Sequence, residues 1–152
     1  DDMMRYLRYK SRDNARTPVQ WNAEKNAGFT QGTPWLMVNP NYTEINVESQ
    51  EKGANSVLSF YKELIALRKN PAYKETIVYG DVIPFEEDRH NLMAYHRKAD
   101  KDLLVIGNFQ KEAQNVTLPS ECKNVLINNY PDAEIKGIEV QLKGYQVLVL
   151  EL

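Results

Sequence analysis

The chain has 152 residues, of which 42% are hydrophobic and 26% charged, and its formal net charge is −2. This composition excludes an intrinsically disordered chain and gives no basic excess for binding a nucleic acid. No apolar run approaches the roughly 20 residues of a membrane-spanning helix, so we expect no membrane partner. A single cysteine, Cys122, excludes an intramolecular disulfide and suits a reducing compartment such as the cytoplasm.

The first third of the chain predicts a short helix followed by a long irregular loop. Met3, Met4 and Leu7 share one face of a helix over residues 2–9. Residues 10–55 are rich in Asn, Pro, Gly and Thr and show almost no periodicity, although they contain both tryptophans. Because exposed loops seldom hold so many aromatic side chains, we expect this loop to pack against a large surface.

The clearest helix is predicted over about residues 56–69. An apolar stripe runs through Val57, Tyr61, Leu64 and Ile65, with Asn55 or Ser56 as N-cap. The sequence Asn-Pro at 70–71 ends this helix, since the residue before proline disfavours helical geometry.

From about residue 76 the hydrophobic pattern changes to a period of two, beginning with Ile77, Val78 and Tyr79. Short strands are predicted at residues 82–85, 92–97, 103–109, 114–118, 124–128, 139–142 and 145–150. Their spacing of about ten residues, with turn residues between them, predicts an antiparallel β-sandwich of Greek-key type. The fold class is therefore mainly β with some helix.

Most groups that could carry chemistry have an ordinary structural interpretation. Cys122 has no obvious partner, and His90 and His96 lack the further ligands that a metal site needs. Strand alternation places His96 toward solvent, and the acidic run at 86–88 reads as a solvated turn. We expect no metal and no cofactor.

The informative phrase is Arg-Asp-Asn-Ala-Arg-Thr-Pro-Val-Gln-Trp at residues 12–21. A guanidinium presents five fixed donors that suit carboxylates and vicinal hydroxyls, and an adjacent Asp can hold it in place. Composition alone favours the simpler interpretation, in which Arg12, Asp13 and Arg16 fasten a long loop.

This phrase resembles a signature of the alpha-amylase family (glycoside hydrolase family 13), in particular its oligo-1,6-glucosidase branch. The resemblance continues in order through residues 26–30, 34–35, 38–42, 45–47, 59–69, 78–80 and 104–109. It implies that residues 1–73 are the last loop and last helix of a (β/α)8 barrel and that residues 76–152 are a C-terminal β-sandwich domain. The chain begins with Asp1 rather than Met, so we expect it to be part of a longer protein.

The resemblance also implies a retaining alpha-glucosidase that hydrolyses short alpha-1,6-glucosides. The catalytic carboxylates of the family belong to motifs absent from this chain, so we expect no catalytic residue here and no activity of the chain alone. One residue carries over as substrate-binding, Arg12, which matches the arginine that reaches the non-reducing-end glucose. Arg16 is expected to be structural, and Asp13 to orient an arginine.

Three alternatives stay open. The substrate preference could be that of a trehalose-6-phosphate hydrolase or a maltose-acting alpha-glucosidase. The β domain could bind glycans through Tyr95, Tyr130 and Tyr145, although we expect these side chains in the core. It could also be purely structural. The expected partners are an oligosaccharide, the rest of the barrel domain and, through exposed apolar surface, a second copy of the chain.

Overall fold

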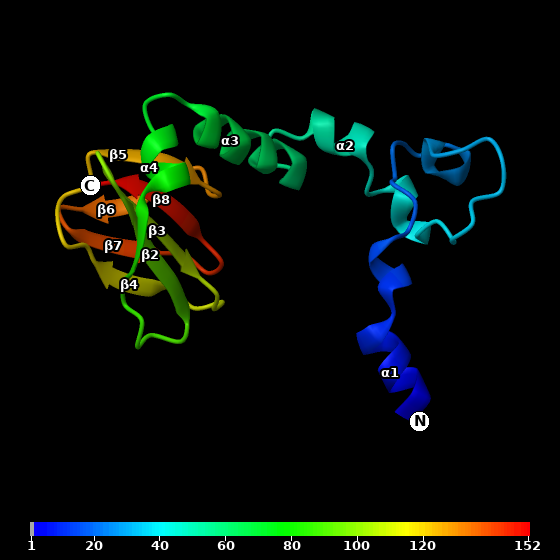
Figure 1. Ribbon diagram of the computed structural model, residues 1–152, viewed down its shortest axis with the longest axis horizontal. Helices are drawn as coiled ribbons and strands as arrows, with labels where there is room; N and C mark the ends of the chain where they lie inside the picture. The colour runs from blue at the N-terminus through cyan, green and yellow to red at the C-terminus, as the bar shows by residue number, and fades with distance from the viewer. Residues whose placement is uncertain (1) are drawn as a thin grey trace. The chain divides into compact units, whose positions relative to one another are not determined.

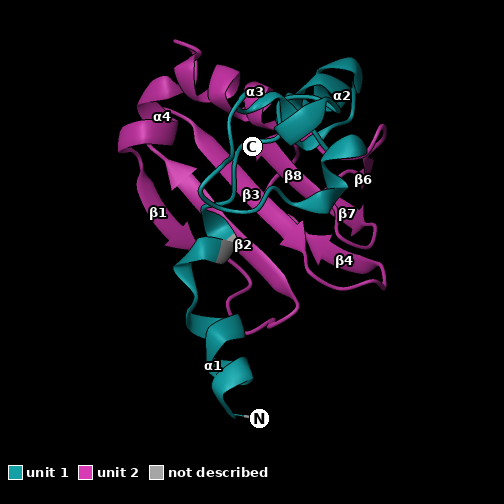
Figure 2. Ribbon diagram, turned by 90° about the vertical axis from the view of Figure 1, so that its right-hand side faces the viewer, with its two compact units in different colours: residues 1–59 teal, residues 60–152 magenta. Residues whose placement is uncertain are grey.

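The computed structural model describes residues 2–152, with Asn14 lacking a described side chain. Two compact units divide the chain between Ser59 and Phe60 (Figure 2). No helix of the described residues is long and apolar enough to cross a membrane.

The first unit contains little regular structure. Its elements are helix α1 (Asp2–Lys10), the 3-10 turns η1 (Arg12–Ala15), η2 (Lys25–Gly28) and η3 (Pro40–Thr43), and helix α2 (Val47–Lys52). Helix α1 confirms the predicted first helix, whereas α2 lies inside the predicted loop and was missed. Asn46 and Ser49 explain α2, because the side chain of each bonds the backbone N–H of the other in a capping box.

Two short helices connect this segment to the strands. Helix α3 (Val57–Lys69) matches the prediction, and Ser56 is its N-cap, with its hydroxyl accepting the Ser59 N–H at 3.1 Å. Residues Lys74–Tyr79 form helix α4, so the prediction that period-two structure begins at Ile77 is wrong. Tertiary contact outweighed β propensity here, because α4 packs on the strands at residues 92–98 and 102–108 (Figure 1).

The rest of the second unit is a two-layer antiparallel β-sandwich, which confirms the predicted fold class. The strands are β1 (Asp81–Pro84), β2 (Leu92–Lys98), β3 (Asp102–Asn108), β4 (Gln114–Thr117), β5 (Asn124–Asn128), β6 (Glu134–Lys136), β7 (Glu139–Leu142) and β8 (Val147–Glu151). One sheet has the order β1-β2-β3-β8-β5 and the other β4-β7-β6. Strand β6 was not predicted, because its three residues are too short to show a period.

The hydrophobic core lies between the two sheets. Every second side chain of the long strands faces it, and the buried cluster comprises Leu104, Ile106, Val116, Leu118, Val140, Leu142, Leu148, Leu150 and Leu152. His96 also faces this side: it is 8% exposed, its Nδ1 lies 2.6 Å from Asp102 Oδ1, and Phe85 packs edge-on against its ring. The prediction that His96 faces solvent is therefore wrong. In the observed register His96 lies opposite Leu104 of the core, so the alternate residues of β2 that include His96 face inward.

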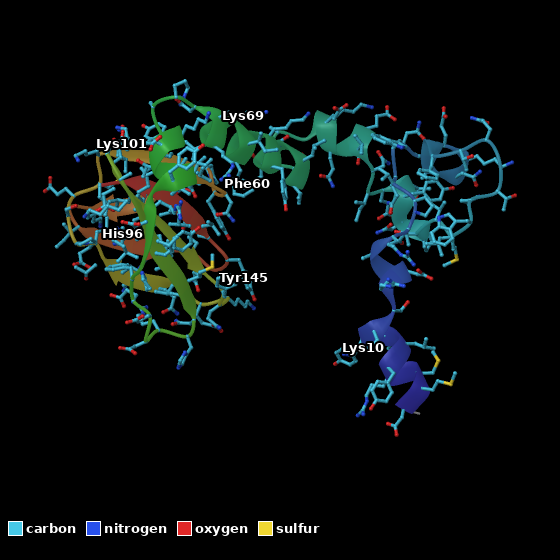
Figure 3. All side chains as sticks on the ribbon, in the orientation of Figure 1. Lys10, Phe60, Lys69, His96, Lys101 and Tyr145 are labelled. Atoms are coloured by element: carbon cyan, nitrogen blue, oxygen red, sulfur yellow. The ribbon has the colours of Figure 1, made fainter. Side chains whose placement is uncertain are left out.

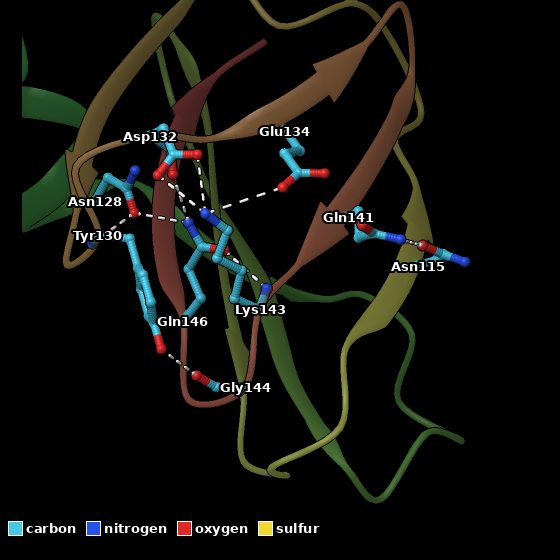
Figure 4. Close-up of polar contacts among 9 residues, drawn as sticks. All are labelled: Asn115, Asn128, Tyr130, Asp132, Glu134, Gln141, Lys143, Gly144 and Gln146. Atoms are coloured by element: carbon cyan, nitrogen blue, oxygen red, sulfur yellow. Dashed lines mark hydrogen bonds and ion pairs between the residues drawn. The ribbon is translucent and has the colours of Figure 1, made fainter.

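A polar cluster fastens the loop between β5 and β6 to the connection between β7 and β8 (Figure 4). Lys143 bonds Asp132 at 2.9 Å and its ammonium lies 5.6 Å from the Tyr130 ring centroid. Gln146 is fully buried and donates to Asn128 Oδ1 at 2.9 Å. The β7–β8 connection also needs Gly144, because a Cβ there would lie 2.2 Å from the Lys111 carbonyl oxygen.

The tyrosines predicted for the core divide between two environments. Tyr95 and Tyr130 are half-buried, but Tyr145 is 61% exposed and adopts a φ of 58° in the β7–β8 connection. The expectation of a buried Tyr145 is wrong, because this residue lies in the turn before β8, where strand alternation does not set its direction. The three rings do not share one exposed platform.

A buried carboxylate, Glu151, joins three separate segments on the other face of the five-stranded sheet. It accepts hydrogen bonds from Tyr73 Oη at 3.0 Å and Asn124 Nδ2 at 2.9 Å, and its Oε1 lies 2.7 Å from Lys101 Nζ. Lys101 lies in the β2–β3 turn, beside the start of α4 (Figure 3). The bond from Lys101, then those from Asn124 and Tyr73, lower the Glu151 pKa to about 2.

We predict that replacing Glu151 by Gln destabilises the second unit by about 1.5–3 kcal/mol at neutral pH, the range for hydrogen bonds to a charged group. The Glu151 pKa falls from 4.5 to about 2 on folding, so its contribution is complete above pH 4.5 and is lost as pH falls toward 2. Urea titrations at several pH values check this. Curves for wild type and variant should converge in acid, and a constant difference across the range would contradict the assignment.

Candidate functional site

The sequence Arg-Asp-Asn-Ala at residues 12–15 folds into the short turn η1. Ser11 precedes it in extended geometry, and the Arg16 N–H closes it on the Asp13 carbonyl at 3.1 Å. This tight turn brings side chains three residues apart onto the same side. The Arg16 guanidinium and the Asp13 carboxylate consequently form a hydrogen-bonded ion pair.

The same arginine contacts an aromatic ring from a distant part of the loop. The Arg16 guanidinium carbon lies 5.5 Å from the centroid of the Trp35 ring. A cation over an indole face is attracted by the negative face of the π-system. Arg16 therefore links the η1 turn to the segment around Trp35, which is the structural arrangement expected of it, and Asp13 orients this arginine.

Arg12 differs from Arg16 in having its donors available. Its side chain is exposed, and it makes no hydrogen bond or ion pair with any described side chain. The structure thus places the predicted substrate-binding arginine on the turn, four residues before the anchored one. None of its five N–H donors has an acceptor among the described residues, and such donors suit the hydroxyl or carboxylate oxygens of a ligand.

Gln20 organises the segment that follows the two arginines. Its side-chain amide donates to Asn41 Oδ1 at 3.1 Å and to the backbone carbonyl of Ile45. The backbone carbonyl of Gln20 accepts the Val47 N–H at 2.9 Å. Gln20 therefore joins the end of the signature phrase to η3 and to the start of α2. This bridging role of Gln20 was not predicted from the sequence. The signal for it is the side-chain amide, which can both donate and accept hydrogen bonds.

A second unpredicted feature is the turn at residues 26–28. Asn26, Ala27 and Gly28 have φ values of 56°, 56° and 68°. Asn26 stabilises the turn by donating from its amide to the carbonyls of Thr30 at 3.0 Å and Gly32 at 2.8 Å. The Ala27 carbonyl accepts the Trp21 N–H at 2.9 Å. The turn therefore fixes the far end of the signature phrase, and Asn-Ala-Gly is the pattern that could have indicated it.

The remaining candidates have structural surroundings. Cys122 is half-buried, its Sγ lies 3.4 Å from the Asn124 carbonyl oxygen, and burial raises the pKa of its thiol. A raised pKa reduces the thiolate fraction and makes a nucleophilic role unfavourable. His90 is exposed on the loop before β2.

Comparison with protein families accounts for both parts of the chain. Residues 1–80 match the model of the alpha-amylase catalytic domain, and residues 92–149 match that of the alpha-amylase SusG C-terminal domain. The chain therefore belongs to the alpha-amylase family, which confirms the resemblance of the residue 12–21 phrase. Helices α3 and α4 lie within the catalytic-domain match, and strands β2 to β7 within the C-terminal match.

The similar proteins include oligo-1,6-glucosidases and a trehalose-6-phosphate hydrolase. A probable oligo-1,6-glucosidase 2 of Bacillus subtilis is 44% identical over 96% of this chain, and an oligo-1,6-glucosidase of Parageobacillus thermoglucosidasius is 41% identical over 99%. The crystal structure of Bacillus licheniformis trehalose-6-phosphate hydrolase superimposes with a TM-score of 0.85 at 41% identity over 99% of this chain. The chain spans only 26%, 27% and 28% of these three proteins, respectively.

We predict that Arg16→Ala loosens the packing of Trp35 and costs about 1 kcal/mol, because an arginine on an exposed indole and a half-exposed ion pair are each worth about 0.5–1 kcal/mol. Near-ultraviolet circular dichroism and tryptophan emission measure the change. Arg12→Ala, which removes a nearby guanidinium without these contacts, is the matched control. An identical spectrum for Arg16→Ala and wild type would contradict the anchoring role.

Proposed function

We propose that this chain is the C-terminal part of a retaining alpha-glucosidase that hydrolyses short alpha-1,6-glucosides such as isomaltooligosaccharides. The observation that carries the proposal is the pair of oligo-1,6-glucosidases at 44% and 41% identity over nearly the whole chain. Their names describe those proteins, and the shared signature phrase is the reason to extend the activity to this one.

The chemistry divides between this chain and the rest of the catalytic domain. A retaining glycosidase uses one carboxylate as nucleophile and another carboxyl group as acid and base, about 5–5.5 Å apart. In this proposal both groups come from the part of the catalytic domain outside this chain. The chain itself contributes the exposed Arg12 guanidinium, which would bind vicinal hydroxyls of the terminal glucose with two parallel N–H donors.

The arrangement around η1 supports this assignment of roles. Because Asp13 and Trp35 hold Arg16 in place, Arg16 gives the turn rigidity, whereas the donors of Arg12 stay available for substrate. A binding group on a fixed turn loses less conformational entropy when a ligand arrives.

A second candidate substrate is trehalose 6-phosphate. It is favoured by the similarity of this chain to the Bacillus licheniformis trehalose-6-phosphate hydrolase, at 41% identity. Both substrates present a glucose in alpha linkage at the cleaved bond and differ in the group beyond it. Assaying the complete protein with isomaltose and with trehalose 6-phosphate separates the two, and faster hydrolysis of the phosphorylated sugar would overturn the first choice.

The C-terminal β-sandwich has a structural role in this proposal, namely to cover and stabilise the catalytic domain. The bonds from Tyr73 to Glu151 and from Thr76 to Asp100 support it, since each joins a catalytic-domain residue to the sandwich. We further place the protein in the cytoplasm, a proposal supported by the unpaired Cys122.

We predict that Arg12→Ala in the complete protein lowers kcat/KM for isomaltose by about 100-fold or more, the effect of about 3 kcal/mol of lost charge-assisted hydrogen bonding. The melting temperature should stay near that of wild type, because Arg12 contacts no described side chain. Arg16→Ala is the paired variant and should lower the melting temperature as well. Unchanged kinetics for Arg12→Ala would remove this residue from the site.

We also predict that the 152-residue chain alone releases no glucose from isomaltose or a nitrophenyl glucoside. The reason is that both carboxyl groups of the reaction are assigned outside it. A glucose-oxidase assay with the complete protein as positive control measures this. Glucose release by the purified chain would show that the catalytic groups had been wrongly placed.

A further inference from the structure

Both ends of the signature phrase are fixed by residues that follow it in the chain. At one end, the Arg16 guanidinium carbon lies 5.5 Å from the centroid of the Trp35 ring. At the other end, the Trp21 N–H donates to the Ala27 carbonyl at 2.9 Å. The geometry of the phrase between these two contacts therefore depends on how the turn at residues 26–28 is held relative to Trp35.

Asn26 holds these two segments together. It lies directly before Ala27, and its amide nitrogen donates to the carbonyls of Thr30 at 3.0 Å and Gly32 at 2.8 Å. Only Thr-Pro separates Gly32 from Trp35, and the proline restricts the backbone there. The phrase, the turn and the Trp35 segment thus close into a ring of contacts within the first unit, which we call the signature frame.

The backbone at the junction of the signature frame is strained. Asn26 and Ala27 both have a φ of 56°, and Ala27 is fully buried. Asparagine tolerates this left-handed region because its short side chain can bond locally, whereas alanine has no such compensation. The N–H of Ala27 donates to the Glu24 carbonyl at 2.9 Å, which helps to hold it there. Strain that the surroundings maintain indicates a role beyond closing a loop.

The position of Arg12 depends on the signature frame. Asp13 pairs with the Arg16 guanidinium, and both residues bound the η1 turn to which Arg12 belongs. Arg12 makes no hydrogen bond or ion pair with any described side chain. The orientation of η1 is therefore what directs the Arg12 guanidinium, and this orientation depends on where Trp35 holds Arg16.

Resting on the proposed function, we propose that Asn26 is a positioning residue for the reaction. By closing the signature frame it holds η1 so that the Arg12 guanidinium meets the terminal glucose in the orientation that the transition state needs. Asn26 itself does not touch the substrate. Displacing a binding group by about 1 Å can cost about 100-fold in rate, so a small change of the frame has a measurable effect.

Asn26→Gly is the informative variant, because glycine keeps the left-handed backbone and removes the amide. In the complete protein it should lower kcat/KM for isomaltose by about tenfold, and the loss should divide between kcat and KM as it does for Arg12→Ala. Asn26→Asp keeps the size but places a carboxylate oxygen beside two carbonyl oxygens, so it should lose at least as much. Wild-type kinetics for Asn26→Gly would overturn the proposal.

An asparagine of the second unit separates positioning from a general loss of stability. Asn129 also bonds two backbone groups: its Nδ2 donates to the Tyr145 carbonyl at 2.9 Å, and its Oδ1 accepts the Val147 N–H at 2.8 Å. Asn129→Ala should lower the melting temperature but leave kcat/KM as in wild type. An equal fall of kcat/KM in Asn129→Ala and Asn26→Gly would show that lost stability alone lowers the activity, against a positioning role.

A double-mutant cycle tests whether Asn26 acts through Arg12. Added to Arg12→Ala, the Asn26→Gly change should lower kcat/KM by less than about twofold, because the group that Asn26 positions is already gone. If the two changes instead multiply to their full separate effects, Asn26 acts independently of Arg12 and the proposal is rejected.

A spectroscopic measurement keeps this inference separate from the proposed function. In complete protein labelled with 5-fluorotryptophan, the ¹⁹F resonance of Trp35, assigned with Trp35→Phe, should shift in Asn26→Gly and Arg16→Ala but not in Asn129→Ala. An unshifted resonance in Asn26→Gly would reject the signature frame. If wild type does not hydrolyse isomaltose, the proposed substrate fails, and the same kinetic comparisons are made with trehalose 6-phosphate.

Discussion

The carboxylate of Glu151 is the interaction on which the second unit depends. It lies at the end of the last strand, where Tyr73, Lys101 and Asn124 all donate to it. These residues come from the segment before α4, the β2–β3 turn and β5. A buried charge needs such complete pairing, because leaving any part of it unpaired would cost more than the bonds contribute. Its surroundings therefore fix where the helical segment meets the sandwich.

Helix α4 begins directly after Tyr73, so the bond from Tyr73 to Glu151 also sets where α4 meets the sheet. Thr76 is fully buried and donates to Asp100, and Arg97 donates to the carbonyl of Ile77. These contacts hold α4 against β2 and β3. The same arginine lines the apolar groove between α3, α4 and the sheet, and its buried Nε–H has no hydrogen-bond partner among the described residues.

The two arginines of the signature phrase show how a local sequence divides its roles. Spacing of three residues lets Asp13 reach Arg16 across a 3-10 turn, and Trp35 then covers that guanidinium. Arg12 precedes Asp13 directly, so it points to a different side of the turn and stays exposed. Arg16 therefore differs from Arg12 in the contacts that it makes, and composition alone does not reveal such contacts.

Local patterns in the sequence were sufficient for helices α1 and α3, most strands, the two-layer antiparallel class and, through the signature phrase, the family. Periodicity determines these features because it fixes which side chains can be buried together. The short elements depend on other interactions. The side chain of Asn46 caps α2, and packing on the sheet stabilises α4 although it contains Ile-Val-Tyr. Strand β6 forms because it pairs with β7. The burial of His96 and Tyr73's bond to Glu151 also required the tertiary structure. Contacts between residues far apart in the chain depend on how the sheets and helices pack, and no local pattern contains that information.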